Sequence, residues 1–382
     1  MAFQSHWFPP STPLFPHASI VLTYLRSYAI EFDLLKHIRL NTRLEEALWE
    51  DDSWKVQLSN GTTRRFDKIV IANGHYGVPR YPTIPGLRDW LDSGRASHSV
   101  FYRNAQPYKG MITLVIGNGP SGQDISVELS GVAATVYHSF GGAPSQDDGA
   151  VRRRGKVIRF GETGTVAFDD GSTTNIDHVI LATGYVMSFP FLPQLRRSQM
   201  PKVPPLPSHV LNSTYNVFPL ARHIFPLQDD FPLDTIAFVG LLVRVVPFPL
   251  FEAQGRFIAK VFSQPDTLDR AKESAGILAR YYELLGQWGD DPTILTEHWH
   301  KLPGSRQFSY RRELLELAGA GKQWDPEDWV EEMYCVKAEL RKAWVEIERS
   351  GQADEWVQGI GEGGRHEWVS LMRRLLKTTK KS

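Results

Sequence analysis

A glycine-rich turn between a strand and a helix constrains this chain more than any other feature. Residues 117–122 read Gly-Asn-Gly-Pro-Ser-Gly and separate the apolar run 111–116 from a helical pattern. Gly117 permits the tight turn, Gly119 lets backbone N–H groups approach a phosphate, and Gly122 lets the helix pack against the strand. The helix start adds unbonded N–H groups and partial positive charge. The segment therefore predicts a dinucleotide pyrophosphate site, and with it nicotinamide-dependent redox chemistry.

The next predicted strand favours NADP over NAD as the coenzyme. An NAD site usually carries Asp or Glu at the end of that strand, about 20 residues on, to bind the ribose 2′-hydroxyl. Here residues 134–138 are followed by Ser139 and Phe140, without an acid. Ser139 can hydrogen-bond a 2′-phosphate, but no arginine is adjacent, so one of Arg152–Arg154 would have to reach the site. The alternative is that these arginines form a solvated turn.

Length and composition favour two domains with proper cores, since the chain has 382 residues of which 42% are hydrophobic. The formal net charge of zero gives no reason to expect a nucleic acid or an anionic membrane as partner. The single cysteine, Cys335, excludes an internal disulfide framework and fits a reducing compartment. No uninterrupted run reaches the ~18 apolar residues of a membrane span. We therefore expect a cytoplasmic protein, and the scattered histidines predict no metal site.

A strand pattern occurs twice, once on each side of the glycine turn. Asp67–Gly74 and Asp177–Gly184 each follow a polar hairpin and run from Asp through a buried strand to Gly. Ligands of open α/β sheets bind at the carboxyl ends of strands. Asn73 with Gly74, and Thr183 with Gly184, are therefore candidates for close approach to a cofactor. The alternative is that each Gly simply ends a strand in an ordinary turn.

Hydrophobic periodicity predicts further elements outside these motifs. The expected helices cover residues 20–36 and, after Asp325 as N-cap, residues 326–351. The expected short strands are 43–48, 54–58 and 63–66, the last two joined at Asn60-Gly61.

Several motifs together resemble the flavin-containing monooxygenase family. Residues 94–102 match its identifying pattern at Gly94, His98 and Tyr102, although Asp92 stands where the family has Phe. Further matches follow in family order: Asn73-Gly-His-Tyr76, Ile84-Pro-Gly86, Ala182-Thr-Gly-Tyr185, Phe238-Val-Gly-Leu241 and Phe248-Pro-x-x-Glu252-x-Gln254. These marks extend over most of the chain.

The resemblance implies an α/β fold with two Rossmann-like dinucleotide-binding domains and a helical C-terminal part. An NADP domain at 106–189 would be inserted into a FAD-type domain made of 1–105 and 190–382. The residues implied to hold the NADP pyrophosphate are Gly117, Gly119, Pro120, Ser121, Gly122, Gln123 and Asp124. On the FAD side the implied contacts are Asn73, Gly74 and the segment from Gly240 to Gln254. His98 and Tyr102 would lie in the linker, where His98 either acts directly or only caps a turn.

The resemblance also implies the reaction. NADPH reduces FAD, and one oxygen atom of O₂ passes to a soft nucleophile, a nitrogen or sulfur centre of a small molecule. The cofactor performs the oxygen chemistry, so no catalytic side chain is assigned. Baeyer–Villiger oxidation of ketones is the alternative. Tyr102 favours heteroatom oxygenation, because Baeyer–Villiger relatives carry Trp at that position. The oligomeric state does not follow.

One departure from the family pattern concerns its FAD-binding βαβ unit, which precedes the segment that this sequence resembles at its start. The chain is therefore expected to contain an incomplete FAD domain, with part of its sheet lost. Without the N–H donors of that glycine turn, the FAD pyrophosphate loses its main anion site. The alternative function is therefore a catalytically inactive NADP-binding remnant or an incomplete gene product, for instance one with a start codon placed too late.

Overall fold

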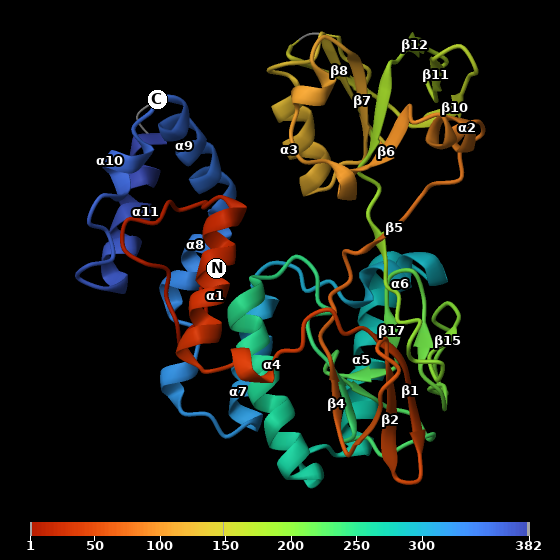
Figure 1. Cartoon of the computed structure of the whole chain (residues 1–382), viewed down its shortest axis with the longest axis vertical. Helices are drawn as coiled ribbons and strands as arrows, with labels where there is room; N and C mark the ends of the chain where they lie inside the picture. Colours follow the sequence, from red (N-terminus) through yellow and green to blue (C-terminus); the bar gives the residue numbers. More distant parts are fainter. Residues whose placement is uncertain (1, 148, 380–382) are drawn as a thin grey trace. The chain divides into compact units, whose positions relative to one another are not determined.

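The computed structural model describes residues 2–147 and 149–379. The chain forms two compact units: Met1–Asn73 together with Phe189–Ser382, and the continuous segment Gly74–Ser188 inserted between them. Figure 1 shows the helices and strands of both units, many of them labelled.

The inserted unit is built on a parallel sheet of five strands in the order β6-β13-β7-β8-β9. An antiparallel meander, β10-β11-β12, accompanies it. The expected parallel sheet around the glycine turn is therefore confirmed. The elements of this unit are β5 (Val78–Pro79), α2 (Leu87–Asp92), β6 (Ala96–His98), β7 (Ile112–Ile116), α3 (Pro120–Leu129), β8 (Thr135–Ser139), β9 (Val151–Arg154), β10 (Val157–Phe160), β11 (Thr165–Phe168), β12 (Thr173–Asn175), β13 (His178–Leu181) and β14 (Tyr185–Val186).

Both faces of this sheet are buried, which explains why β7 reads as a continuous apolar run. Leu114 and Ile116 contribute to a core with α2 and the meander, whereas Val115 packs with Ile125 and Leu129 of α3. Side chains alternate between the faces of a strand, so one five-residue strand supplies two separate cores.

This unit begins at Gly74, well before the boundary that the sequence suggested at residue 106. The difference arises because β6 pairs in parallel with β13 and so becomes an edge strand of the sheet. Leu87 and Trp90 of α2 are also buried in the core against β10. These long-range contacts bind residues 74–105 to the inserted unit.

The other unit combines short strands with helices. The strands are β1 (Leu44–Glu50), β2 (Ser53–Leu58), β3 (Thr63–Phe66), β4 (Ile69–Ile71), β15 (Arg196–Arg197), β16 (Leu211–Asn212), β17 (Val217–Phe218), β18 (Leu220–Ala221), β19 (Phe225–Pro226) and β20 (Ile236–Phe238). The helices are α1 (Ala18–Glu31), α4 (Pro247–Ser263), α5 (Arg270–Trp288), α6 (Pro292–Trp299), α7 (Arg306–Leu317), α8 (Asp328–Cys335), α9 (Lys337–Arg349), α10 (Ala353–Val357) and α11 (Arg365–Thr379). The three predicted strands and the hairpin at Asn60-Gly61 are confirmed, and they form an antiparallel meander β1-β2-β3. Strand β4 pairs in parallel with β20.

The main core of this unit lies among α4, α5, α6 and α7 and the strands beside them. Phe218, Phe257 and Trp299 are among its fully buried side chains. A second, smaller core joins α8 to α11 through Trp344 and Leu375.

The single helix predicted at residues 326–351 is wrong. Two helices, α8 and α9, occupy the segment and are separated at Val336, whose φ of −108° and ψ of 22° are not helical. The N-cap of α8 is Glu327 instead of Asp325. Residues 334–338 contain neither Gly nor Pro, so no local breaker marks the division. Packing of α8 and α9 in one core with α11 explains it better.

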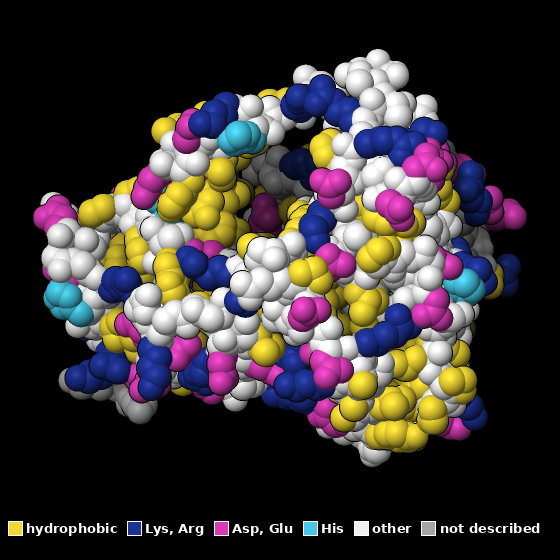
Figure 2. Space-filling model, turned by 90° about the horizontal axis from the view of Figure 1, so that it is seen from below, with side chains coloured by type: hydrophobic (Ala, Val, Ile, Leu, Met, Phe, Trp, Pro, Cys, Tyr) yellow, Lys and Arg dark blue, Asp and Glu magenta, His cyan; other side chains and the backbone are white. Residues whose placement is uncertain are grey.

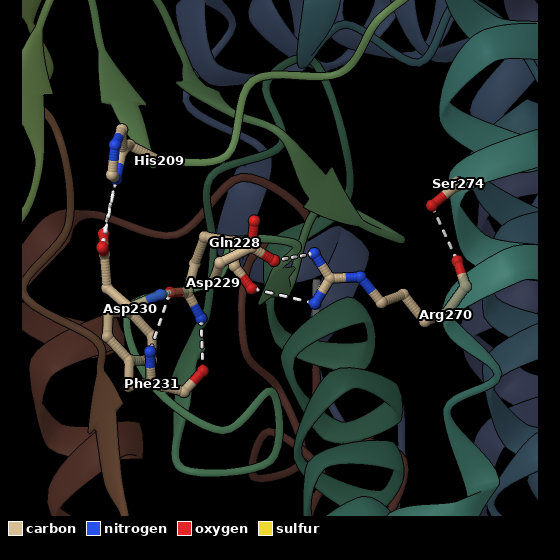
Figure 3. A network of polar contacts seen from close by, with 7 residues as sticks. All are labelled: His209, Gln228, Asp229, Asp230, Phe231, Arg270 and Ser274. Carbon is tan, nitrogen blue, oxygen red and sulfur yellow. Dashed lines mark hydrogen bonds and ion pairs between the residues drawn. The ribbon is translucent and has the colours of Figure 1, made fainter.

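A polar network fixes the loop that leads into β20 (Figure 3). The Gln228 side chain accepts from Phe231 N–H across 3.0 Å and donates to the carbonyl oxygen of Phe231 across 2.6 Å. Arg270, the first residue of α5, donates to the Gln228 carbonyl oxygen across 3.0 Å and pairs with Asp229. The loop is thereby tied to the main helical core.

Charged side chains of both signs are interspersed on the face shown in Figure 2. This distribution fits the formal net charge of zero. Among the described residues, no helix combines the length and the apolar character needed to cross a membrane.

Candidate functional site

The glycine turn follows β7 directly, and its first and last glycines are required by backbone contacts. Gly117 has a φ of +119°, which L side chains rarely adopt, and a Cβ there would lie 2.2 Å from the carbonyl oxygen of Ala182. A Cβ on Gly122 would lie 1.9 Å from the carbonyl oxygen of Gly117. Both positions therefore exclude any side chain, as the spacing predicted.

The middle glycine faces open space. A Cβ on Gly119 would meet no atom within 4 Å, and its φ of −75° and ψ of 174° suit any residue. Gly119 is also the N-cap of α3, and no described side chain caps that helix. Pro120 takes the first helical position, where it has no N–H to satisfy. The first-turn N–H groups of α3 are therefore available to an anion.

The other predicted pyrophosphate residues lie at this same helix start. Pro120, Ser121, Gln123 and Asp124 are exposed. Gln123 Nε2 donates to the Asn118 side-chain oxygen across 3.2 Å and so ties the first turn of α3 to the glycine turn.

The end of β8 holds the glycine turn from the side. Gly117 N–H donates to the Ser139 carbonyl oxygen across 2.9 Å, and His138 Nε2 donates to the Gly117 carbonyl oxygen across 2.8 Å. His138 is 7% exposed, and burial lowers its pKa, so the ring is neutral at pH 7. Sequence reasoning missed His138, because only the register of β7 beside β8 brings it to the turn.

A cleft of about 480 Å³ opens at the carboxyl ends of β7 and β8. It is lined by Pro82, Ile84, Ile116, Gly117, Asn118, Ser139, Phe140, Gly141, Lys156, Val157 and Thr183. The structure thus brings the predicted residues Gly117, Ser139 and Thr183 together in one cleft, at the sheet edge where α/β folds bind ligands. Lys156 was missed, since the chain reaches the cleft there only after β9.

The structure changes the interpretation of the polar residues near the end of β8. The fully buried Ser139 hydroxyl donates to the Gly155 carbonyl oxygen across 2.5 Å, so its proton is already engaged. Arg152 donates to the Tyr137 hydroxyl across 3.0 Å, and Arg154 pairs with Asp147 across 2.6 Å. Residues 151–154 form β9, so the solvated turn suggested for Arg152–Arg154 is wrong. Among the described residues that line the cleft, none is an arginine.

The second strand motif, Asp177–Gly184, contributes Thr183 to the lining of this cleft. The Thr183 hydroxyl donates to the Arg80 carbonyl oxygen across 2.6 Å. The Gly184 carbonyl oxygen accepts two hydrogen bonds, each 3.0 Å long, from the Arg80 backbone N–H and from His98 Nε2. His98 is fully buried and its Nδ1 accepts from Val100 N–H across 3.1 Å. His98 therefore caps a turn and fastens Gly184, while Tyr102 packs against Tyr108.

Asn73 and Gln254 belong to the other unit. The exposed Asn73 follows β4, and β4 runs parallel to β20, so Asn73 and Gly240 end neighbouring strands at one sheet edge. Gln254 is fully buried on α4, where its Oε1 accepts from Gly240 N–H across 3.0 Å and its Nε2 donates to Tyr310 across 3.2 Å. Gln254 thus positions Gly240. Gly74, with a φ of +72°, follows Asn73 directly.

The described residues show no group of three or more His, Cys, Asp or Glu side chains arranged to hold a metal ion. The glycine cleft instead offers an uncapped helix start, an open position at Gly119 and two glycines that only a bare backbone can occupy. These features fit a dinucleotide phosphate, and together with the parallel sheet they define a dinucleotide-binding oxidoreductase.

Comparison with known proteins gives the family. The family model described as flavin-binding monooxygenase-like matches residues 1–143 and 147–283, so the chain belongs to this family of enzymes, which use FAD and NADPH. The resemblance found in the sequence is confirmed, as are the fold class and both cofactors.

Three similar proteins illustrate this relationship. Flavin-containing monooxygenase FMO GS-OX-like 5 of Arabidopsis thaliana is 28% identical over 359 residues, covering 90% of this chain and 73% of that protein. The thiol-specific monooxygenase of Saccharomyces cerevisiae is 31% identical over 336 residues, covering 83% of this chain and 70% of that protein. The solved structure of S-allyl-L-cysteine S-oxygenase from Allium sativum has a TM-score of 0.74 at 25% identity, covering 100% of this chain and 82% of that chain.

Proposed function

We propose that this protein oxygenates a soft nitrogen or sulfur centre of a small molecule, using NADPH and O₂. Support comes first from the glycine cleft, where the uncapped start of α3 and the open space at Gly119 suit the coenzyme pyrophosphate. Support for sulfur comes from similar proteins, since one is an S-oxygenase and another a thiol-specific monooxygenase. A thioether or thiol is therefore the preferred substrate class.

The residues of this chain would bind and orient the cofactors. The N–H groups of Ser121 and Gly122 would receive the NADPH phosphates, and His138 would hold the Gly117 turn in place. On the FAD side, Asn73 and Gly240 would line one strand edge, with Gln254 fixing Gly240. When bound, the reduced flavin supplies the oxygen-transfer chemistry. The protein therefore needs few side chains that take part in bond making.

Substrate assays test the reaction class. The purified 382-residue chain is given NADPH with a thioether, a tertiary amine or a cyclic ketone, and products are identified by mass spectrometry. We expect sulfoxide formation that consumes NADPH in equal amount. Lactone as the sole product would overturn the proposal in favour of Baeyer–Villiger oxidation.

Cofactor binding tests whether this chain is active by itself. A visible flavin absorbance band in the purified protein, together with substrate-dependent NADPH oxidation, would support the proposal. NADPH binding without flavin and without oxygenation would contradict it and favour the inactive NADP-binding alternative. Calorimetric titration with NADPH examines the glycine cleft independently of the flavin.

A further inference from the structure

We infer that Lys156 is the residue that selects NADPH over NADH, by binding the phosphate on the 2′-position of the adenosine ribose. This inference rests on the proposed placement of NADPH in the glycine cleft. In dinucleotide-binding folds the ribose lies at the end of the second strand, which here is β8. The residue that recognises a 2′-phosphate must therefore reach the end of β8.

Backbone contacts bring Lys156 to that position although it lies beyond β9. Phe140 N–H donates to the Arg154 carbonyl oxygen across 3.2 Å, and the Ser139 hydroxyl donates to the Gly155 carbonyl oxygen across 2.5 Å. On the other side, Asp169 N–H donates to the Lys156 carbonyl oxygen across 2.9 Å. The chain around Lys156 is thus fixed directly beside the end of β8.

The Lys156 side chain then lies over Gly141. A Cβ on Gly141 would be 2.8 Å from Lys156 Cε and 3.8 Å from Nζ. Lys156 and Gly141 both line the cleft together with Ser139 and Gly117. Toward the described residues, the exposed Lys156 ammonium forms no hydrogen bond or ion pair. Its charge is therefore available to an anion in the cleft.

The other candidates for this role are engaged elsewhere or, like the exposed Arg153, lie outside the described cleft lining. The Ser139 hydroxyl gives its proton to Gly155, so it cannot also donate to a phosphate in this arrangement. Arg152 and Arg154 are held by Tyr137 and Asp147. Among the described cleft-lining residues, Lys156 is the one cation, and none is an acid that would accept the 2′-hydroxyl of NAD.

The test compares nucleotides that differ only in the 2′-phosphate. Calorimetry on the full chain measures Kd for 2′,5′-ADP against 5′-AMP, and for NADPH against NADH, in wild type and Lys156→Gln. A charge-assisted hydrogen bond predicts about 10- to 100-fold weaker binding of 2′,5′-ADP and NADPH in the variant. Binding of 5′-AMP and NADH should not change. Because the ammonium is exposed, high salt should reduce the preference for the 2′-phosphate.

The controls distinguish a specific role of Lys156 from a general effect of surface charge, and test separately whether NADPH binds in the glycine cleft. Lys109→Gln makes the same substitution at an exposed lysine that precedes β7, outside the described cleft lining, and should bind like wild type. Lys156→Arg should retain most of the preference. Equal affinity of wild type and Lys156→Gln for 2′,5′-ADP would overturn the inference about Lys156 but not the proposed binding of the nucleotide in the cleft. Failure of wild type to bind any of the four nucleotides would overturn the placement and the inference together.

Discussion

His138 Nε2 donates to the carbonyl oxygen of Gly117 across 2.8 Å and so joins strand β8 of the parallel sheet to the glycine turn. The carbonyl can only accept, so the imidazole proton resides on Nε2. Burial lowers the pKa of His138, which keeps the ring neutral. A strand residue therefore sets the orientation of the turn that faces the coenzyme.

Replacing His138 with Phe should weaken coenzyme binding and stability together. The substitution leaves the partly buried Gly117 carbonyl oxygen without its donor, and an unsatisfied buried acceptor typically costs about 1–3 kcal/mol. We expect the free energy of unfolding to fall by about this amount, and Kd for NADPH to rise about tenfold as the turn loosens. Urea denaturation and calorimetry measure the two effects. The control is His37→Phe, which changes an exposed histidine. An unchanged Kd for NADPH in His138→Phe would show that His138 does not orient the glycine turn.

The three glycines of the turn should respond differently to substitution. Gly119→Trp should abolish NADPH binding yet leave the thermal midpoint near that of wild type, because its backbone suits any residue and its Cβ meets nothing. Gly122→Ala should instead destabilise the fold, since the added Cβ would strike the Gly117 carbonyl oxygen. Calorimetry and thermal melting distinguish the two variants. Wild-type affinity in Gly119→Trp would show that the coenzyme does not occupy this turn.

Gln254→Leu should destabilise the unit that contains it without affecting the glycine cleft. The fully buried side-chain amide of Gln254 accepts a hydrogen bond from Gly240 N–H and donates one to the Tyr310 hydroxyl. Loss of these partners predicts a decrease of about 1–3 kcal/mol in the free energy of unfolding. NADPH affinity should stay the same, because the cleft lies in the other compact unit. If Gln254→Leu also lost NADPH affinity, the expectation that Gln254 acts only within its own unit would be contradicted.

A pair formed by the partly buried His223 and the buried His300 provides a prediction about pH. His300 Nε2 accepts from Val217 N–H, so its Nδ1 carries the proton and donates to Nδ1 of His223 across 3.0 Å. Burial, reinforced by Arg280 and Arg306, lowers the pKa of His223 to about 3. Unfolding restores the ordinary value of about 6.5. The unfolded chain therefore takes up the proton more readily, and stability is lost as pH falls from about 6.5 to about 3.

His223→Asn should remove much of that pH dependence. His223 has a φ of +60°, which Asn tolerates, and the Asn side-chain oxygen can accept from His300. Chemical denaturation of both proteins from pH 7 to pH 4 measures the difference. The stability of wild type should fall more steeply than that of the variant on acidification. Parallel curves would mean that other histidines with lowered pKa values, such as His138 and His178, account for the acid sensitivity.

Local spacing predicted the elements whose conformation is decided by near neighbours in sequence. The glycine turn, its flanking strand and helix, and the hairpin at Asn60-Gly61 all depend on backbone preferences within a few residues. The family motifs were recognisable for the same reason. By contrast, no local signal marks the division at Val336 of the helix predicted at residues 326–351, whose two parts, α8 and α9, share one core with α11.

The sequence by itself therefore determined the class of fold and the position of the phosphate turn. The tertiary structure decided which side chains accompany that turn. Strand pairing brings His138 beside Gly117, and hydrogen bonds between the end of β8 and residues 154–155 bring Lys156 over Gly141. The same pairing engages Ser139 and Arg154 elsewhere. Contacts between residues distant in the chain depend on sheet register, which no periodicity along one segment specifies.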